Sequence, residues 1–353
     1  MNRKNLCKEI INLNEFADFY RYFHEVKTHD GMKLLMTHKI PANQDPIAPI
    51  ILVHGLGQNR YTWTQTRRSL ENYLVSKGFE TFNVELRGHG LSRANGSDYP
   101  THFEKYIYYD IPALFNAIYE ITNCKKMFYM GHSLGGAISY CVGPNFQEYL
   151  AGIISIAGPF RMGEGNNLLK WISKIGVSLD KLLQISNLHP PAFYIDLIGV
   201  LVKYGLFIFD SPNFKNFPIQ VWYPKTIERD ILIERIEKGF DRTGINVVKY
   251  LFQWSAKGKF YSSDGRIDFE ESISDLKIPI LFVNGNKDYA VLKEAVQEAY
   301  DKAGSKDKTL KVFGEELQDL NWGHIDLISG QYAPQFVWPY IFDWIKERVS
   351  PCA

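Results

Sequence analysis

The chain has 353 residues, a length that fits one large domain with an insertion or two small domains. Hydrophobic residues make up 45% of it and charged residues 22%, which are ordinary values for a globular protein with a sizeable core. The formal net charge of +1 gives no reason to expect nucleic acid as a partner.

The sequence shows no targeting or redox signature. Residues 1–9 include basic side chains but no apolar run of the kind a secretory signal needs, and no stretch reaches the ~18 apolar residues of a membrane span. The cysteines, Cys7, Cys124, Cys141 and Cys352, are far apart and predict neither a disulfide framework nor a zinc site. We therefore expect a cytoplasmic protein with buried thiols at Cys124 and Cys141, and without a metal, a cofactor or an obligate protein partner.

After a peripheral start, the first half of the chain alternates between strand and helix patterns. Residues 1–20 are predicted to be helical or irregular, and Asp30-Gly31 predicts a hairpin within 23–40. The alternating segments that follow are predicted at 50–53 (strand), 67–77 (helix), 80–86 (strand), 106–121 (helix), 127–130 (strand), 137–142 (helix) and 150–156 (strand). Such alternation favours a parallel sheet with helices on both faces.

This alternation stops at residue 160 and resumes near residue 276. The interval is predicted to be helical without a clear strand, with helices at 168–185, 193–209, 227–238 and 244–255. The pattern then closes with a strand at 278–285, a helix at 292–302, a strand at 309–313 and a helix at 336–348. The sequence thus predicts an α/β fold with a mostly parallel central sheet flanked by helices. Residues 159–275 are predicted to form a helical cap inserted between two core parts, 1–158 and 276–353.

One turn carries the strongest chemical signal. The apolar residues 127–130 lead into Gly131-His132-Ser133-Leu134-Gly135, and a helical run follows. A G-x-S-x-G turn between strand and helix holds its serine in a strained conformation that exposes the hydroxyl. We predict Ser133 as a nucleophile and the amide of Leu134 as one donor to a developing oxyanion. A second donor is predicted in the loop after the first buried strand, at Leu56.

Serine is a poor nucleophile unless a base takes up its proton. His324 follows the last predicted strand, at the edge where the carboxyl ends of the strands meet, and is predicted to be this base. His54, His89 and His132 also lie on edge loops. A structural role is predicted for these three, because the base must also meet an orienting acid.

The acid is expected at the end of another strand. Asp288 follows such a strand and is predicted to hold His324 in the correct tautomer. Glu164, just after the strand at 150–156, is an outside candidate. Asp319 and Asp326 are too close to His324 in the sequence to serve easily.

The order Ser133, Asp288, His324 is that of the α/β-hydrolases, and the chain resembles their lipase and esterase branch over roughly residues 48–158 and 276–347. The resemblance rests on the motifs His54-Gly55-Leu56-Gly57, Glu85-Leu86-Arg87-Gly88-His89-Gly90-Leu91-Ser92, Gly131-His132-Ser133-Leu134-Gly135-Gly136, Asn284-Gly285-Asn286-Lys287-Asp288 and Gly323-His324. The second motif is similar to the D-x-R-G-x-G-x-S turn of monoglyceride-lipase-like enzymes, with Glu85 where Asp is common. The resemblance implies the α/β-hydrolase fold and hydrolysis of a carboxylic ester through an acyl-enzyme.

The aromatic and aliphatic cap predicts a hydrophobic acyl substrate, because an apolar wall supplies most of the binding of a fatty chain. Residues 193–209 are apolar nearly all round, with only Asp196 and Lys203 charged. We expect them to wall an acyl pocket above Ser133 and to allow transient contact with a lipid interface, although ordinary core packing explains the same stripe. Two other functions stay open. One is a thioesterase or acyltransferase with the same triad, and the other is a non-catalytic ligand receptor on this fold.

Overall fold

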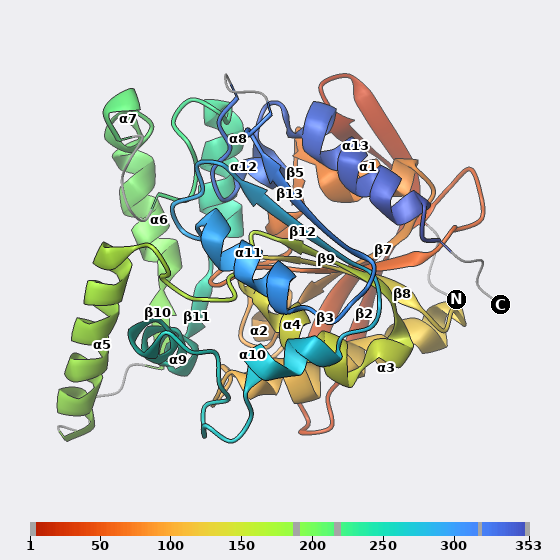
Figure 1. Ribbon diagram of the computed structural model, residues 1–353. Helices are drawn as coiled ribbons and strands as arrows, with labels where there is room; N and C mark the ends of the chain where they lie inside the picture. The colour runs from red at the N-terminus through yellow and green to blue at the C-terminus, as the bar shows by residue number, and fades with distance from the viewer. Residues whose placement is uncertain (1–4, 186–190, 215–219, 317–319, 350–353) are drawn as a thin grey trace.

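A central sheet with an antiparallel extension organises the chain. The computed structural model describes residues 5–185, 191–214, 220–316 and 320–349. The parallel strands are β4 (Pro49–Val53), β7 (Glu80–Glu85), β8 (Met127–His132), β9 (Leu150–Ile156), β12 (Ile280–Gly285) and β13 (Lys308–Phe313). The antiparallel strands are β1 (Asn5–Asn12), β2 (Glu15–Lys27), β3 (Lys33–Pro41), β5 (Thr64–Gln65) and β6 (Arg68–Ser69). Within these ranges the order is β13-β12-β9-β8-β4-β7-β3-β2-β1-β6-β5, which confirms the predicted α/β fold with a mostly parallel central sheet (Figure 1).

Side chains of the central strands alternate between two cores. Ile51 and Val53 of β4 pack on one face, whereas Ile50 and Leu52 pack on the other, because successive strand side chains point to opposite faces. The first face is covered by α3 (Ile111–Thr122), α4 (Leu134–Asn145) and α11 (Lys293–Lys302), and the second by α1 (Leu70–Ser76) and α13 (Ala333–Lys346). Shorter helical turns are η1 (Arg60–Thr62), α2 (Gly90–Ala94), η2 (Tyr106–Asp110), η3 (Gln147–Tyr149), α10 (Phe269–Ser272), η6 (Ile273–Asp275) and α12 (Asp326–Ser329).

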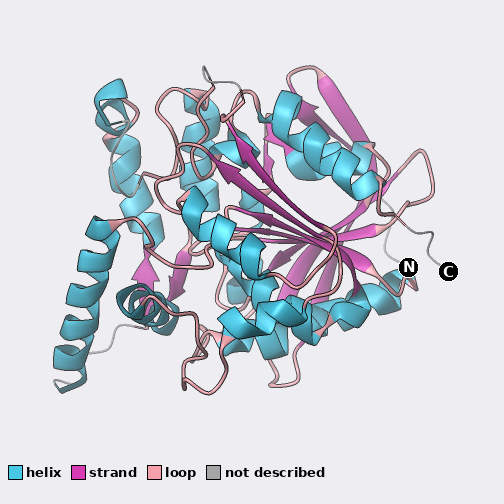
Figure 2. Cartoon of the chain, viewed as in Figure 1, coloured by secondary structure: helices cyan, strands magenta, loops and turns pink. Residues whose placement is uncertain are grey.

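The segment between β9 and β12 lies beyond the carboxyl ends of the parallel strands, and Figure 2 shows the strands pointing toward its helices. These helices are α5 (Asn167–Ile185), α6 (Ile195–Tyr204), α7 (Leu206–Phe209), η4 (Pro212–Phe214), α8 (Arg229–Glu234), η5 (Arg235–Gly239) and α9 (Ile245–Lys257). The prediction that this interval is helical without a clear strand missed one short antiparallel pair, in which β10 (Ala192–Tyr194) pairs with β11 (Arg242–Gly244). The predicted helix over 193–209 is divided for two reasons. The strand pairing takes its first residues, and α6 ends before Gly205.

Expectations about the cysteines and about membranes have mixed outcomes. Cys141 is a free and buried thiol, as predicted, but Cys124 is disulfide-bonded, so the thiol predicted at Cys124 is wrong. Because disulfides persist mainly in oxidising compartments, this bond removes the argument for a reducing one. None of the described helices is long and apolar enough to cross a lipid bilayer.

The first strands correct the prediction that residues 1–20 are helical or irregular. β1 and β2 form a long antiparallel ribbon, in which Leu6 pairs with Tyr20 and Ile10 with Phe16. The ribbon continues through the predicted hairpin into β3. In β2 the buried side chains of Ala17 and Phe19 alternate with more exposed ones. This period of two is hard to recognise in the sequence, because large apolar residues such as Phe16 and Phe23 also stand exposed.

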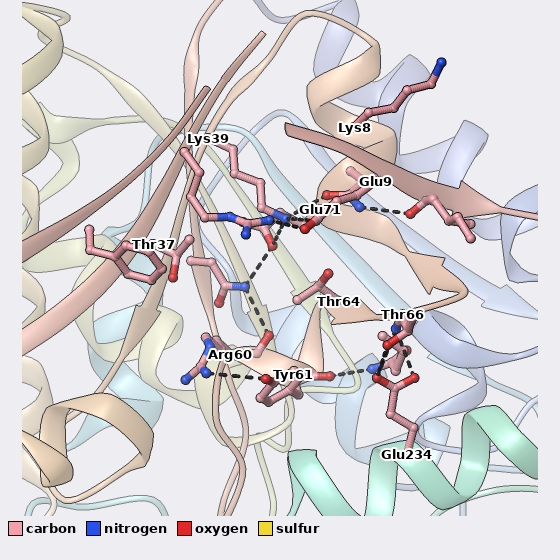
Figure 3. A pocket seen from close by; sticks show the side chains of 16 residues that line it. Lys8, Glu9, Thr37, Lys39, Arg60, Tyr61, Thr64, Thr66, Glu71 and Glu234 are labelled. Atoms are coloured by element: carbon pink, nitrogen blue, oxygen red, sulfur yellow. Dashed lines mark hydrogen bonds and ion pairs between the residues drawn. The ribbon is translucent and has the colours of Figure 1, made fainter. Parts of the chain in front are cut away.

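A cavity of about 430 Å³ with many polar lining residues lies where this ribbon meets α1 and the loop before it (Figure 3). At its floor, the buried ammonium of Lys39 lies 2.7 Å from Asn72 Oδ1 and 3.0 Å from Glu71 Oε2. Glu9 of β1 pairs with Arg21 of β2 above this pair. Charges that enter a low-dielectric interior stabilise it only when they are paired. The ribbon is therefore attached to α1 through a mutually paired charge cluster.

We predict that Lys39→Met will lower the free energy of unfolding by about 3 kcal/mol, because the buried carboxylate of Glu71 loses its cation. Urea denaturation followed by circular dichroism measures the change. Lys33→Met is the matched control on the same strand, since Lys33 pairs with Glu25 at 3.4 Å where both side chains are about half exposed. The control should cost less than about 1 kcal/mol. Equal losses in the two variants would contradict a special role for the buried pair.

Candidate active site

Ser133 stands at a backbone turn that few residues other than glycine adopt. β8 ends at His132 and α4 begins at Leu134, and Ser133 between them has φ 54° and ψ −117°. The neighbouring backbones pass too closely for larger residues: a Cβ at Gly131 would lie 2.3 Å from the carbonyl oxygen of Gly135. A non-glycine residue at positive φ stores strain that the surrounding structure must sustain. The turn therefore lifts the Ser133 side chain out of the sheet.

His324 and Asp288 meet at the same edge of the sheet. His324 Nδ1 lies 2.7 Å from Asp288 Oδ2, and both side chains are buried. The other oxygen of Asp288 accepts hydrogen bonds from the backbone amides of Ala290 and Val291, at 2.9 and 2.8 Å. Both oxygens of the Asp288 carboxylate are thus held by hydrogen bonds. Because Asp288 contacts Nδ1 of His324, the Nε2 atom lies at the opposite edge of the ring. Ser133 and His324 line one common cavity.

The loop that carries Leu56 runs directly against the serine. A Cβ added to Gly55 would lie 3.0 Å from Ser133 Cβ. His54 fixes the base of this loop, because Nδ1 donates to the Gly55 carbonyl at 2.9 Å and Nε2 accepts from the Leu86 amide at 3.2 Å. Burial lowers the pKa of His54 to about 3, so its ring stays neutral. Leu56 and Leu134, the predicted oxyanion donors, both line the cavity beside Ser133.

The other candidate histidines and acids have backbone or surface partners. His89 Nδ1 donates to the carbonyl of Arg87 at 3.0 Å, and His132 Nε2 lies 3.1 Å from the carbonyl oxygen of His324. Burial lowers the pKa of both His89 and His132. Glu164 pairs with Lys170 at 3.0 Å, and 42% of its side chain is exposed. Asp319 lies outside the described residues.

The Glu85 turn has bonding partners that fit a structural role. Glu85 Oε2 accepts from the amide of Leu91 at 2.7 Å, and Oε1 accepts from Arg60 Nη1 at 3.0 Å. Ser92 ends the motif by donating to the carbonyl of Glu85 and accepting from the amide of Leu35. Glu85, which is longer than the aspartate common at this position, therefore connects the end of β7 to the start of α2.

The cavity in front of Ser133 measures about 540 Å³, within the range of small-molecule sites. The cap supplies most of its apolar wall, through Ile195, Ile198 and Val202 of α6 and through Phe209 of α7. Phe207 does not belong to this wall, since 74% of it is exposed.

Sequence analysis missed several residues of the wall, namely Gln58, Gln220, Val221, Trp222 and Phe240. Gln58 could have been suspected, because it follows the His54–Gly57 motif directly. The others come from cap segments without a regular pattern. Only the folded cap brings them to the cavity.

Comparison with known proteins agrees with this geometry. Residues 48–184 match the family described as alpha/beta hydrolase fold. The gastric triacylglycerol lipase of Homo sapiens is 23% identical over 96% of this chain and 91% of its own length. Lipase member K of Mus musculus is 29% identical over 96% of this chain and 92% of its own. The chain thus has the α/β-hydrolase fold, and its relatives over nearly the whole length are lipases.

Solved structures extend this comparison to the fold of the hydrolase. A monoacylglycerol lipase from Paleococcus ferrophilus superimposes with a TM-score of 0.56 at 17% identity, over 93% of this chain and 99% of that one. The Pyrococcus furiosus esterase Pf2001 gives a TM-score of 0.55 at 15% identity, over 94% of both chains. At this identity the likeness concerns the fold alone.

Asp326 is a buried carboxyl close to His324 that joins the histidine loop to the cap. Its Oδ2 accepts hydrogen bonds from the amides of Gly323 and Tyr223, the latter at 2.9 Å. Its Oδ1 has no hydrogen-bond partner among the described residues. Burial is the main cause that raises the pKa of Asp326 to about 7, although the two amides oppose the shift.

This raised pKa predicts a specific pH dependence of stability. Unfolded aspartate titrates near pH 4, so between about pH 4 and 7 the folded state binds the extra proton, and stability falls as the pH rises. Asp326→Asn removes this titration. The free energy of unfolding of the variant, relative to wild type, should therefore increase from pH 5 to pH 8.

Urea denaturation at these two pH values measures the difference. Asp343→Asn, at an exposed position of α13, is the control. This variant removes a carboxyl from the surface and leaves Asp326 in place, so its difference from wild type should be the same at both pH values. A constant difference for Asp326→Asn as well would contradict the raised pKa.

Proposed function

We propose that this protein is a serine hydrolase that cleaves carboxylic esters with a hydrophobic acyl chain. The supporting observation is that Ser133 and the Asp288-bound His324 line one largely apolar cavity. The lipase and esterase relatives indicate a carboxylic-ester hydrolase. Their names also include triacylglycerol and monoacylglycerol lipases, which act on esters of fatty acids.

In the proposed mechanism, His324 Nε2 removes the proton of Ser133 as the hydroxyl oxygen attacks the ester carbonyl. Asp288 accepts the Nδ1 hydrogen bond and stabilises the imidazolium that forms. The amides of Leu56 and Leu134 donate to the carbonyl oxygen as it becomes negative. The imidazolium then protonates the departing alcohol, which leaves an acyl group on Ser133. Water activated by His324 hydrolyses this acyl-enzyme. Thioester hydrolysis and acyl transfer pass through the same intermediate and differ in the leaving group or in the acceptor.

The surface of the cap that faces the cavity is proposed to select the acyl chain. The solvent-exposed surface of the cap is proposed to contact lipid. Ile198 and Val202 of α6 face the cavity, whereas other apolar side chains of the cap stand in solvent. These are Trp171 and Leu179 of α5, Leu201 and Tyr204 of α6, and Phe207 of α7, which are 53–75% exposed. A contiguous exposed apolar surface marks an interaction site, and a lipid surface would bring esters to the cavity behind it.

We predict that Ser133→Ala will lower kcat for p-nitrophenyl butyrate by a factor on the order of 10⁴, and that His324→Ala will lower it nearly as much. The double variant should lose little more than either single one, because the residues act as a unit. Glu164→Gln is the control and should stay active. A fluorophosphonate probe should label wild type at Ser133. Failure to label the folded protein would support a receptor instead of an enzyme.

A second prediction separates the two sides of the cap. Val202→Trp fills the cavity and should lower kcat/KM for p-nitrophenyl palmitate at least ~15-fold more than for the acetate. That factor corresponds to lost contact with two methylenes, at about 0.8 kcal/mol each. Phe207→Asp should leave this chain-length ratio unchanged but weaken binding to phosphatidylcholine vesicles in a sedimentation assay. Equal effects of Val202→Trp on both esters would contradict the acyl pocket.

A further inference from the structure

A buried arginine of the cap lies against the active-site loops, and no anionic partner of it occurs among the residues that the structure describes. Arg235 begins η5 and has no solvent exposure. It donates hydrogen bonds to the carbonyls of Thr62 and Tyr61, to Gln58 Oε1 at 3.3 Å and to Ser329 Oγ at 3.5 Å. All four acceptors are neutral, and within the described ranges Nε has no hydrogen-bond partner. Burial lowers the pKa of Arg235 to about 9, which still leaves it charged at neutral pH.

Such a residue is costly for the fold. A charge that is removed from water without a counter-charge destabilises a protein by several kcal/mol. The same order of free energy is lost when one partner of a buried ion pair is removed. Each carbonyl that the guanidinium holds could instead be satisfied by a neutral donor. The cost is therefore better explained by what the cation does for the site than by stability alone.

The contacts of Arg235 lead to the loop that carries Leu56. Gln58 lies two residues after Leu56 and lines the cavity. Its Oε1 accepts from Arg235 and from Thr62 Oγ1, the latter at 2.8 Å. A Cβ added to Gly55 would lie 3.3 Å from the same oxygen. The guanidinium thus holds the segment that directly follows the predicted oxyanion amide, through Gln58, Tyr61 and Thr62.

The same cation also reaches the histidine side of the site. Ser329 closes α12, the short helix that follows His324. Burial is the main cause that lowers the pKa of His132, and the positive charge of Arg235 lowers this pKa further. His132 in turn lies 3.1 Å from the carbonyl oxygen of His324. One buried positive charge therefore contacts Gln58, on the loop that carries Leu56, and Ser329, on the helix that follows His324.

We propose that Arg235 is a positioning residue that holds the Leu56 loop in its oxyanion-binding geometry and sets a fixed positive charge behind it. This inference rests on the proposed ester hydrolysis. Preorganised donors and charges act on the transition state because they need no rearrangement when the oxyanion forms. The contribution of Arg235 should then appear in kcat and in the binding of oxyanion mimics, and not in the binding of the ground-state ester.

The test compares Arg235→Met, Arg235→Lys and wild type with a soluble short ester, p-nitrophenyl butyrate. We expect kcat of Arg235→Met to fall on the order of 10- to 100-fold, while KM stays within about threefold of wild type. This loss of kcat is somewhat smaller than the loss caused by removing a direct oxyanion donor. The inhibition constant of a trifluoromethyl ketone, which forms a charged tetrahedral adduct on serine, should rise by the same factor. Binding of the matching methyl ketone should not change. Arg235→Lys keeps the charge but loses the two-pronged hydrogen bonding of the guanidinium. Its kcat and its inhibition constant should lie between those of wild type and those of Arg235→Met.

Two further variants keep the outcome decisive. Arg229→Met changes an exposed arginine of α8 and should behave as wild type. Gln58→Leu cuts the contact to the Leu56 loop while Arg235 remains. It should lower kcat on the order of tenfold even if Arg235→Met proves too unstable to assay. The losses of Gln58→Leu and Arg235→Met should be less than multiplicative in the double variant.

The inference is overturned if a folded Arg235→Met keeps kcat within twofold of wild type. It is also overturned if the variant loses thermal stability and binds the trifluoromethyl ketone and the methyl ketone equally more weakly. If Arg235→Met does not fold, an unaffected Gln58→Leu overturns it. A wild-type protein without ester hydrolysis would overturn the proposed function together with this inference. An active wild type with unaffected variants overturns the inference alone.

Discussion

The active site depends on one crowded turn. Ser133 has positive φ where β8, α4 and the loop after β4 meet, and no Cβ fits at the nearby Gly131, Gly135 and Gly136 without a shift of the neighbouring atoms. A Cβ at Gly135 would strike the carbonyl oxygen of Val53 at 2.4 Å, and one at Gly136 would lie 2.7 Å from Gly158 Cα. Because rigid sheet backbone surrounds the turn, the strain at Ser133 cannot relax. The serine hydroxyl, the Leu134 amide and the neighbouring Leu56 loop are therefore placed together by backbone packing.

The cap is fastened to the two loops that complete this site. Asp241, the residue before β11, donates from its amide to the Gly57 carbonyl at 2.7 Å, and its carboxylate accepts from the Gly90 amide at 2.7 Å. On the other side, the amide of Ile325 donates to the carbonyl of Val221 at 2.8 Å. These bonds hold the cap segments near the serine in a fixed relation to the core.

Local signals made the core of the site predictable from sequence. Ser133, Asp288 and His324 each follow an apolar run, and parallel strands place such positions at one edge. The N-terminal ribbon, β10 and β11 were missed, because their pairing is decided by partners far along the chain. Arg235 carried no signal either, since a lone arginine on a short helix is usually a solvated one. Its burial follows from the way the cap packs on the Leu56 loop.

The insertion of the cap between β9 and β12 has a consequence for biosynthesis. Residues are synthesised from the N-terminus, and domains generally fold as units while the chain emerges. Ser133 and its turn leave the ribosome more than 150 residues before Asp288 and His324 do, because the whole cap is translated in between. The nascent chain thus carries Ser133 without its proposed base, His324, and β9 without its neighbour β12. The proposed site is complete only when the last fifth of the polypeptide has joined the sheet.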